Sequence, residues 1–206
     1  MVSIPEVEPY DLPPGDRPQN VVTWTVDPAR AVLLVHDMQH FFLRFFPDVV
    51  RQQLLHNVAA LRDRCRAAGI PVAYTTQPGR MTTAQRGLLR HFWGNGMTDS
   101  PADRDVAPPL EPAPSDWVFT KWRYSAFCRS DLADRMRDND RDQLIVCGIY
   151  AHIGVQATAV DAFSNDIQPF VVDDAIADFS AGHHRAATRF LTEQCAAVIS
   201  TGEFLP

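Results

Sequence analysis

LIVCGIYAHIGV, residues 144–155, sets the fold class of this chain. The run LIVC is short and apolar, as expected of a buried strand, and the glycine after it interrupts the run before a predicted helix. In doubly wound α/β proteins, ligands bind beyond the carboxyl end of a strand and at the N-terminus of the next helix. This turn presents Tyr150, His152 and Gly154 at that place. It has neither Ser nor Cys at the helix start, so no nucleophile is predicted there.

Segments of strand and helix character alternate along the rest of the chain. The helix over 49–68 has apolar residues at helical spacing and Gly69 as its stop. Alternation of strands and helices predicts a parallel sheet with right-handed crossovers. We therefore predict an α/β fold, three-layered and Rossmann-like, with a mostly parallel six-stranded sheet flanked by helices. Strands are predicted at 31–35, 70–75, 117–120, 144–149, 170–172 and 197–200, and further helices over 132–137, 153–164 and 183–195.

The composition is that of one globular domain. The chain has 206 residues, of which 46% are hydrophobic and 21% charged, enough for a sizeable core. Residues 1–20 are rich in Pro and acidic side chains and are predicted to form an extended arm, followed by a single domain over 21–206. Residues 77–116 show no clear period and contain six prolines. Because a long irregular segment in a compact domain is usually functional, we expect this insertion to cover the site.

Charge and cysteine usage exclude several classes of partner. The formal net charge of −6 argues against nucleic acid, which needs a basic surface, although a local cluster of Arg and Lys can still hold a small anion. The N-terminus does not resemble a secretory signal, and no apolar run is long enough to span a bilayer. The four cysteines show no metal-ligand spacing, and Cys147 is predicted to be a buried, inert thiol. We expect a cytoplasmic protein without nucleic-acid or membrane partners.

Three residues follow the ends of predicted strands. Asp37 comes directly after the run AVLLVH, Lys121 stands in the same relation to the strand at 117–120, and Gly154 marks the position after a third strand. A lone Asp after a strand is more often a cap or turn residue, and Gly154 could serve only close helix packing. Because the carboxyl ends of parallel strands share one edge of the sheet, the three together predict a site.

The motifs around these residues resemble the isochorismatase-like hydrolase superfamily, in particular its phenazine-pathway members, over nearly the whole chain. Cysteine-hydrolase members of that superfamily use an Asp, a Lys and a Cys. Asp37 and Lys121 match the first two, whereas Gly154 stands at the position of the Cys. A chain that keeps the acid and the lysine without the thiol is expected to do acid chemistry, not acyl transfer. The motifs are VLLVHDMQ (32–39), YTTQPG (74–79), QRGLL (85–89), KWRYSAF (121–127), GIYAHIGV (148–155) and AIADFS (175–180).

The resemblance implies cleavage of the enol-pyruvyl ether of 2-amino-2-deoxyisochorismate into trans-2,3-dihydro-3-hydroxyanthranilate and pyruvate, in phenazine or related antibiotic biosynthesis. Isochorismate is the alternative substrate. No cofactor is implied, and a homodimer is expected. A vinyl ether is activated by protonation of its methylene carbon, so the reaction needs a general acid and not a nucleophile. Asp37 is predicted to be that acid, with Lys121 as its positioning partner.

The same resemblance implies a set of substrate ligands. Gln77 and Arg86 come from the insertion, and a guanidinium can hold a carboxylate in a bidentate manner. In cysteine hydrolases of the superfamily the peptide bond at the place of Ile149 and Tyr150 is often cis, and the sequence alone leaves its isomer open. Three aromatic residues are predicted to form an apolar wall, with ordinary core packing as the alternative. The further substrate-binding residues are Tyr150, Gly154, Trp93, Phe42 and Tyr124.

One physical tension concerns the proton on Asp37. An acid must hold its proton at neutral pH, whereas a neighbouring Lys121 lowers the pKa of a carboxyl group. Burial against aromatic residues and the carboxylates of the substrate oppose that effect. We predict that Asp37 is protonated mainly in the substrate complex.

Three other interpretations fit the sequence less well. A cysteine amidase needs a thiolate at the site, which Gly154 removes, and Cys147 lies on the wrong side of the turn. A binding protein without catalysis would not need the acid and the lysine. A metal site is not expected, because the spacing of the histidines reproduces no ligand set; they are His36, His152, His183 and His184.

Overall fold

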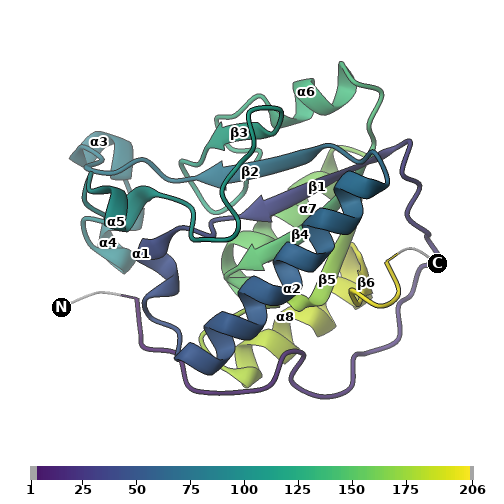
Figure 1. Ribbon diagram of the computed structural model, residues 1–206, viewed down its shortest axis with the longest axis horizontal. Helices are drawn as coiled ribbons and strands as arrows, with labels where there is room; N and C mark the ends of the chain where they lie inside the picture. Colours follow the sequence, from purple (N-terminus) through teal and green to yellow (C-terminus); the bar gives the residue numbers. More distant parts are fainter. Residues whose placement is uncertain (1–3, 205–206) are drawn as a thin grey trace.

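Six strands form one sheet, which is parallel throughout where a mostly parallel one was predicted (Figure 1). The computed structural model describes residues 4–204. The first three residues of the predicted arm and residues 205–206 of the predicted domain lie outside this range. The strands lie in the order β3-β2-β1-β4-β5-β6. Their bounds are β1 (Ala31–His36), β2 (Val72–Thr76), β3 (Trp117–Thr120), β4 (Gln143–Ile149), β5 (Gln168–Ala177) and β6 (Ala197–Ile199).

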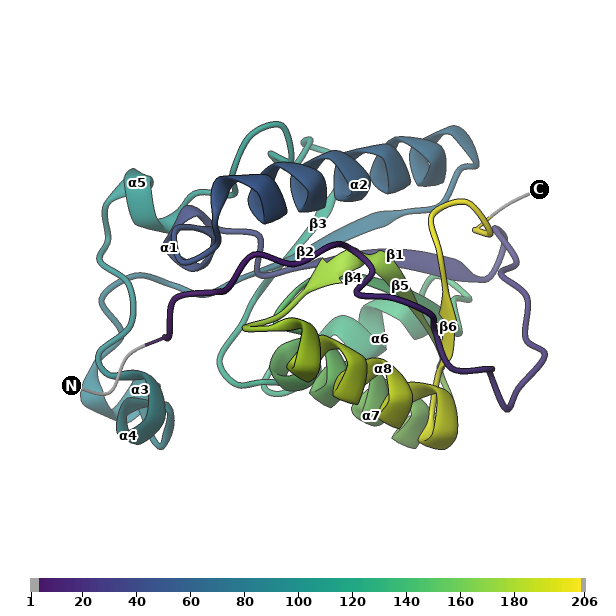
Figure 2. The ribbon, with the colours of Figure 1, turned by 90° about the horizontal axis from the view of Figure 1, so that it is seen from below.

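Helices cover both faces of the sheet and give the predicted three layers (Figure 2). One long helix, α2, lies along one face, and α6, α7 and α8 lie on the other; four short helices lie beyond the carboxyl ends of the strands (Figure 1). No helix within the described residues is long and apolar enough to cross a bilayer. The bounds are α1 (His40–Leu43), α2 (Asp48–Ala67), α3 (Thr83–Arg86), α4 (Leu89–Trp93), α5 (Pro101–Arg104), α6 (Leu132–Arg137), a π-helical turn η1 (Ala151–Val155), α7 (Gln156–Ser164) and α8 (Ala181–Gln194).

The central strand β1 shows why its sequence is apolar without alternation. Leu33 and Val35 pack in the core on the α2 side, whereas Val32 and Leu34 pack in the core with α6, α7 and α8. A central strand of a parallel sheet is buried on both faces, so each position favours an apolar residue. All residues of β1 are buried.

The strand order places a crevice at the carboxyl ends of the central strands β1 and β4. The chain leaves β1 toward β2 on one side and later returns to β4 on the other side of β1. This reversal is the topological switch point of a doubly wound sheet, where ligands bind outside the carboxyl ends of the strands. Asp37 follows β1 and the turn at 149–151 follows β4, so both lie at this crevice.

The strand β5 is longer than predicted, Gln168–Ala177 instead of 170–172. Two aspartates interrupt its apolar pattern, but each has a partner in the fold. Asp173 accepts a hydrogen bond from Nε2 of His184 at 2.9 Å, and Asp174 accepts one from the backbone N of Thr201 at 2.8 Å. Tertiary contacts therefore extend the strand beyond its apolar run.

The predicted irregular insertion contains three short helices, α3, α4 and α5. Each has only four or five residues, too few to produce a recognisable period in the sequence. The helix predicted from residue 153 begins two residues earlier, as the π-helical turn η1, and continues as α7.

Residues 4–20 run as an extended arm across the molecule between α2 and α8 (Figure 2). Three apolar side chains of the arm, Ile4, Val7 and Leu12, are buried in the core on the α2 side. The backbone N of Val7 donates to the carbonyl of Phe45 at 2.9 Å, and the side chain of Gln53 donates to the carbonyl of Leu12 at 2.9 Å. The arm is thus packed into the fold along most of its length.

Candidate active site

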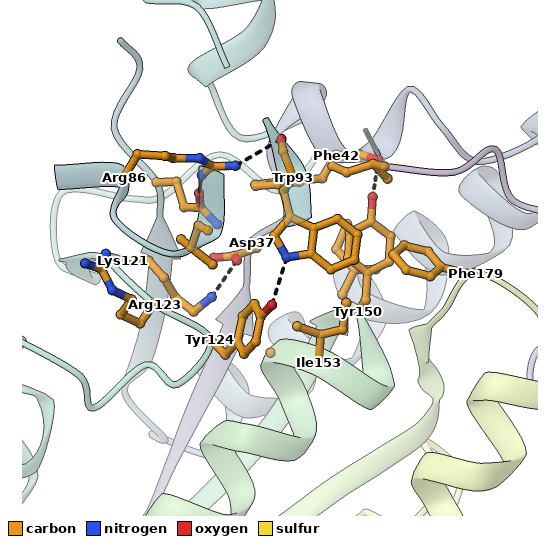
Figure 3. Close-up of a pocket in the computed structure, with 15 residues that line it drawn as sticks. Asp37, Phe42, Arg86, Trp93, Lys121, Arg123, Tyr124, Tyr150, Ile153 and Phe179 are labelled. Atoms are coloured by element: carbon orange, nitrogen blue, oxygen red, sulfur yellow. Dashed lines mark hydrogen bonds and ion pairs between the residues drawn. The ribbon is translucent and has the colours of Figure 1, made fainter. Parts of the chain in front are cut away.

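Asp37 is the centre of a buried polar group at the carboxyl end of β1 (Figure 3). Its φ is 53°, in the left-handed region, which Asp tolerates better than most residues. Lys121, directly after β3, donates from Nζ to Oδ2 of Asp37 at 2.7 Å, and Thr75 of β2 donates from Oγ1 to Oδ1 at 2.8 Å. Asp37 is 5% exposed and Lys121 is 3% exposed. The ion pair is therefore largely removed from water.

The charge of Lys121 decides the protonation state of Asp37. Burial alone would raise the pKa of Asp37, but the positive charge of Lys121 and the hydrogen bonds from Lys121 and Thr75 outweigh it. The pKa of Asp37 consequently lies below its ordinary value, in the direction predicted from the sequence. Asp37 is a carboxylate in the free site.

His36, the last residue of β1, lies beside this ion pair. Its side chain is fully buried, and its Nδ1 is 3.8 Å from Oδ2 of Asp37. Burial, followed by the charge of Lys121, lowers the pKa of His36 to about 4. The imidazole is therefore neutral at pH 7 and adds no second cation next to Asp37.

Arg86, at the end of α3, is a buried guanidinium without an acidic partner among residues 4–204. Its Nη1 donates to Oε1 of Gln77 at 3.1 Å and its Nε donates to the carbonyl of Gly94 at 3.0 Å. Burial and the nearby charge of Arg123 lower its pKa. Neutral acceptors leave the charge of Arg86 uncompensated, and a buried cation of this kind favours an anionic ligand.

Aromatic side chains form the opposite wall (Figure 3). Trp93 donates from Nε1 to the hydroxyl of Tyr124 at 2.9 Å, and the hydroxyl of Tyr150 donates to the carbonyl of Phe42 at 3.0 Å. Phe179 packs against Tyr150 with ring centroids 4.6 Å apart. The hydrogen bond between Trp93 and Tyr124 joins the insertion to the segment after Lys121. These rings line the cavity, and Phe42 and Tyr150 also belong to the core on the α2 side.

One cavity contains every residue predicted for the site. Five lining residues beyond that set lie within the motifs quoted from the sequence, namely Leu89, Arg123, Ile149, Ile153 and Phe179. No sequence signal identified Ile4 as a lining residue, because its position at the cavity depends on the path of the N-terminal arm. The predicted residues that line the cavity are Asp37, Phe42, Gln77, Arg86, Trp93, Lys121, Tyr124, Tyr150 and Gly154, and the others are Ile4, Leu89, Arg123, Ile149, Ile153 and Phe179.

The histidines considered as metal ligands have other partners. His152 bonds through Nδ1 to Asp178 at 2.6 Å, and Nδ1 of His183 lies 2.9 Å from the hydroxyl of Ser180. Within the described part of the chain, no group of three or more His, Cys, Asp or Glu side chains is placed to hold a metal ion.

Comparisons with known proteins agree with the fold and the motifs. A family model described as the Isochorismatase domain matches residues 31–203. The chain belongs to the isochorismatase family. It is 57% identical over 204 residues to the probable isochorismatase of Pseudomonas chlororaphis, with 98% of this chain and 99% of that one covered. It is 56% identical over 206 residues to the phenazine biosynthesis protein PhzD1 of Pseudomonas aeruginosa, with both chains covered completely.

A solved structure of a cysteine hydrolase from Pseudomonas syringae pv. phaseolicola 1448A matches with a TM-score of 0.82. It covers 90% of this chain and 95% of that chain at 24% identity, which supports the shared fold. The family match over residues 31–203 and the 57% identity to a probable isochorismatase show a hydrolase of the isochorismatase type.

The isochorismatase-family site described here has no thiol or aliphatic hydroxyl among its lining residues within the described chain. Cys147 is fully buried in β4, its Sγ donates to the carbonyl of Leu34 at 3.6 Å, and burial raises its pKa well above the ordinary value. It is the inert thiol that the sequence predicted. The bond between Ile149 and Tyr150 is cis, which the sequence alone left open.

Proposed function

We propose that this enzyme cleaves the enol-pyruvyl ether of 2-amino-2-deoxyisochorismate to trans-2,3-dihydro-3-hydroxyanthranilate and pyruvate. The observation that carries the proposal is a buried acid paired with Lys121, in a cavity whose described lining offers no thiol and no aliphatic hydroxyl. A phenazine pathway is supported by the 56% identity to a protein named for phenazine biosynthesis.

Asp37 supplies the proton in the proposed mechanism. It protonates the terminal methylene carbon of the vinyl ether, which becomes the methyl group of pyruvate, and the positive charge is shared between the ether carbon and its oxygen. Water adds to that carbon and gives a hemiketal. The hemiketal then breaks its bond to the ring oxygen, and the products are pyruvate and the ring alcohol.

Substrate binding makes Asp37 an acid in this proposal. The carboxylates of the substrate place negative charge near the site and displace water, and both effects raise the pKa of a carboxyl group. They oppose the charge of Lys121, so that Asp37 is protonated mainly in the complex. Lys121 holds the acid in place and binds a polar group of the substrate.

Arg86 and Gln77 hold a substrate carboxylate in this proposal. The Arg86 guanidinium is buried, positively charged and bonded only to neutral acceptors among the described residues, and Gln77 accepts one of its hydrogen bonds. A carboxylate is the natural counter-ion for such a group. Tyr150 and Gly154 line the same cavity and are assigned contacts with the substrate ring in this proposal. The aromatic side chains that also line it are assigned the exclusion of water; they are Trp93, Phe42 and Tyr124.

Further features of the assembly are proposed with the reaction. We expect a homodimer, one catalytic domain over 21–206 with its arm, and a cytoplasmic location without cofactor, nucleic acid or membrane. The location is supported by four cysteines that are all free, as in a reducing compartment.

Pyruvate release tests the proposal. The enzyme is assayed with lactate dehydrogenase as the coupling enzyme, in metal-free buffer, with 2-amino-2-deoxyisochorismate and isochorismate compared side by side. A higher kcat/KM for the amino substrate is the expected result, and a higher value for isochorismate would reassign the substrate. Binding of either compound without pyruvate release would contradict the proposed activity and favour a binding protein.

A further inference from the structure

His36 is enclosed by two glycines. Gly148 lies opposite it on β4 with a φ of 106°, and a Cβ at that position would lie 2.2 Å from the carbonyl oxygen of His36. A Cβ on Gly154 would lie 2.2 Å from Cε1 of the imidazole. Ordinary van der Waals contacts of a Cβ begin at 3.4 Å. Neither position can therefore accept a side chain while His36 keeps its place.

The imidazole is held by groups from three segments. Its Nδ1 lies 2.8 Å from the carbonyl of Ile149, which can only accept, so Nδ1 carries the proton. Nε2 lies 3.3 Å from the hydroxyl of Thr158, and the ring is also hydrogen-bonded to the backbone of Tyr124. The Thr158 hydroxyl in turn accepts from the backbone N of Ala126 at 3.0 Å. One side chain thus joins the end of β1, the turn after β4 and the segment that follows Lys121.

We propose that His36 is a positioning residue for the reaction assigned above, and that Gly154 is required because the imidazole occupies the space of any side chain there. The pair fixes Asp37 relative to the turn at 149–150. It also closes position 154 to a covalent nucleophile, so the reaction depends on acid chemistry. The positioning of Asp37 by His36 rests on the proposed function, whereas the exclusion of a side chain at position 154 does not.

The route from His36 to the reaction is short. Asp37 follows it directly in the chain and has the left-handed backbone conformation, so the carboxylate moves if the imidazole moves. A displacement of about 1 Å in a catalytic group can cost on the order of 100-fold in rate. Arg86 and Gln77 bind from the insertion and do not contact His36, so substrate affinity is expected to change little.

Two substitutions of His36 separate positioning from packing. His36→Asn keeps a donor for the carbonyl of Ile149, whereas His36→Leu has a similar volume without a hydrogen bond. We expect His36→Leu to lower kcat about 100-fold with KM little changed, and His36→Asn to retain kcat within about ten-fold. Equal kcat values in the two variants, or an effect confined to KM, would overturn the positioning role.

The melting temperatures of two single variants and their double variant test the proposed steric contact between His36 and Gly154. Gly154→Ala is expected to lower Tm, and adding His36→Ala to it is expected to raise Tm again, because the space of the imidazole then admits the new methyl group. If Gly154→Ala does not fold, recovery of a folded double variant gives the same answer. Gly182→Ala is the matched control, since the nearest atom to its Cβ would be 3.6 Å away.

The two failures are distinguishable. A double variant that unfolds at or below the Tm of Gly154→Ala overturns the proposed complementarity of His36 and Gly154. A wild-type enzyme that releases no pyruvate overturns the proposed function and the positioning role of His36, but the Tm values of the variants still test the steric contact.

Discussion

At the scale of single residues, the site contains one cation with a carboxylate partner, Lys121, and one without, Arg86, among the described residues. Lys121 is paired with Asp37 at 2.7 Å, whereas Arg86 has only neutral acceptors among the described residues. The first arrangement holds an acid in one position. The second, at Arg86, is suited to bind an anionic group. Substitutions at the two positions should therefore affect different steps of the reaction.

Asp37→Asn keeps the shape of the acid but removes the proton that it transfers. We expect kcat to fall by about 10²- to 10⁴-fold, the usual contribution of a general acid, with a much smaller change in KM. The coupled assay for pyruvate measures both. Because this variant leaves Lys121 unpaired, a loss of stability of about 3–5 kcal/mol is also expected, and thermal unfolding must show that the protein is still folded. Activity within ten-fold of wild type in folded Asp37→Asn would reject Asp37 as the acid.

Arg86→Met removes the uncompensated cation and should act mainly on binding. Hydrogen bonds to charged groups contribute about 1.5–3 kcal/mol, so KM should rise roughly 10- to 100-fold. Tm should stay the same or rise, since a buried charge without a counter-ion is lost. The exposed Arg90→Met on α4 is the control, and both variants are assayed for KM and Tm. An unchanged KM in Arg86→Met would mean that the substrate carboxylate binds elsewhere.

At the scale of elements, the extended arm is part of the pocket. Ile4 lines the cavity, and the hydroxyl of Tyr10 accepts a hydrogen bond from the backbone N of Asp178 at 2.7 Å. Asp178 directly precedes Phe179, which packs on Tyr150. The arm therefore supports one wall of the cavity from outside the sheet.

Deletion of residues 2–9 tests this role of the arm. Ile4 and Val7 are lost from the core, at about 1.5–3 kcal/mol each, so Tm should fall by roughly 5–20 °C. KM should rise more than kcat falls, because the chemistry at Asp37 is not touched directly. Glu8→Ala, on an exposed position of the arm, serves as the control. If the deletion leaves KM and Tm at their wild-type values, the arm has no part in the site.

At the scale of the whole molecule, acid should destabilise the fold through a buried neutral histidine. The folded-state pKa of His36 is about 4 and its ordinary value is 6.5, so between these values the unfolded chain binds a proton that the folded chain does not. The contribution of neutral His36 to the free energy of unfolding is fully present above pH 6.5. It is lost as the pH drops toward 4, which lowers the free energy of unfolding by about 3 kcal/mol. Asp37, whose pKa is also depressed, adds a further loss in more acidic solution.

Urea unfolding at several pH values between 7.5 and 4 measures this dependence. The groups that face His36 are Lys121, Asp37 and the carbonyls of Ile149 and Tyr124. His36→Asn should remove most of the pH dependence above pH 5 and leave the part due to carboxylates. An unchanged slope in that variant would assign the acid sensitivity to other groups.

The sequence predicted the layers of the molecule better than its irregular parts. Apolar runs such as AVLLV were sufficient for β1, because both faces of that strand are buried. The second half of β5 could not be predicted, because Asp173 and Asp174 interrupt its apolar run and their partners come from distant segments. The motifs contain the predicted acid, lysine and aromatic residues, and the structure brings these residues to one cavity. The motifs could not reveal that His36, considered only as a metal ligand, fills the space next to Gly154, because that contact exists only in three dimensions.

In the proposed mechanism the ether breaks after protonation of carbon and addition of water to the pyruvyl carbon. One turnover of wild-type enzyme in water enriched in a heavy oxygen isotope, followed by mass spectrometry of the ring product, tests this order of steps. We expect the ring hydroxyl to keep the unlabelled oxygen of the ether, because the hemiketal breaks on the pyruvyl side. Label in the ring hydroxyl would show that water attacks the ring carbon, and would contradict the proposed mechanism.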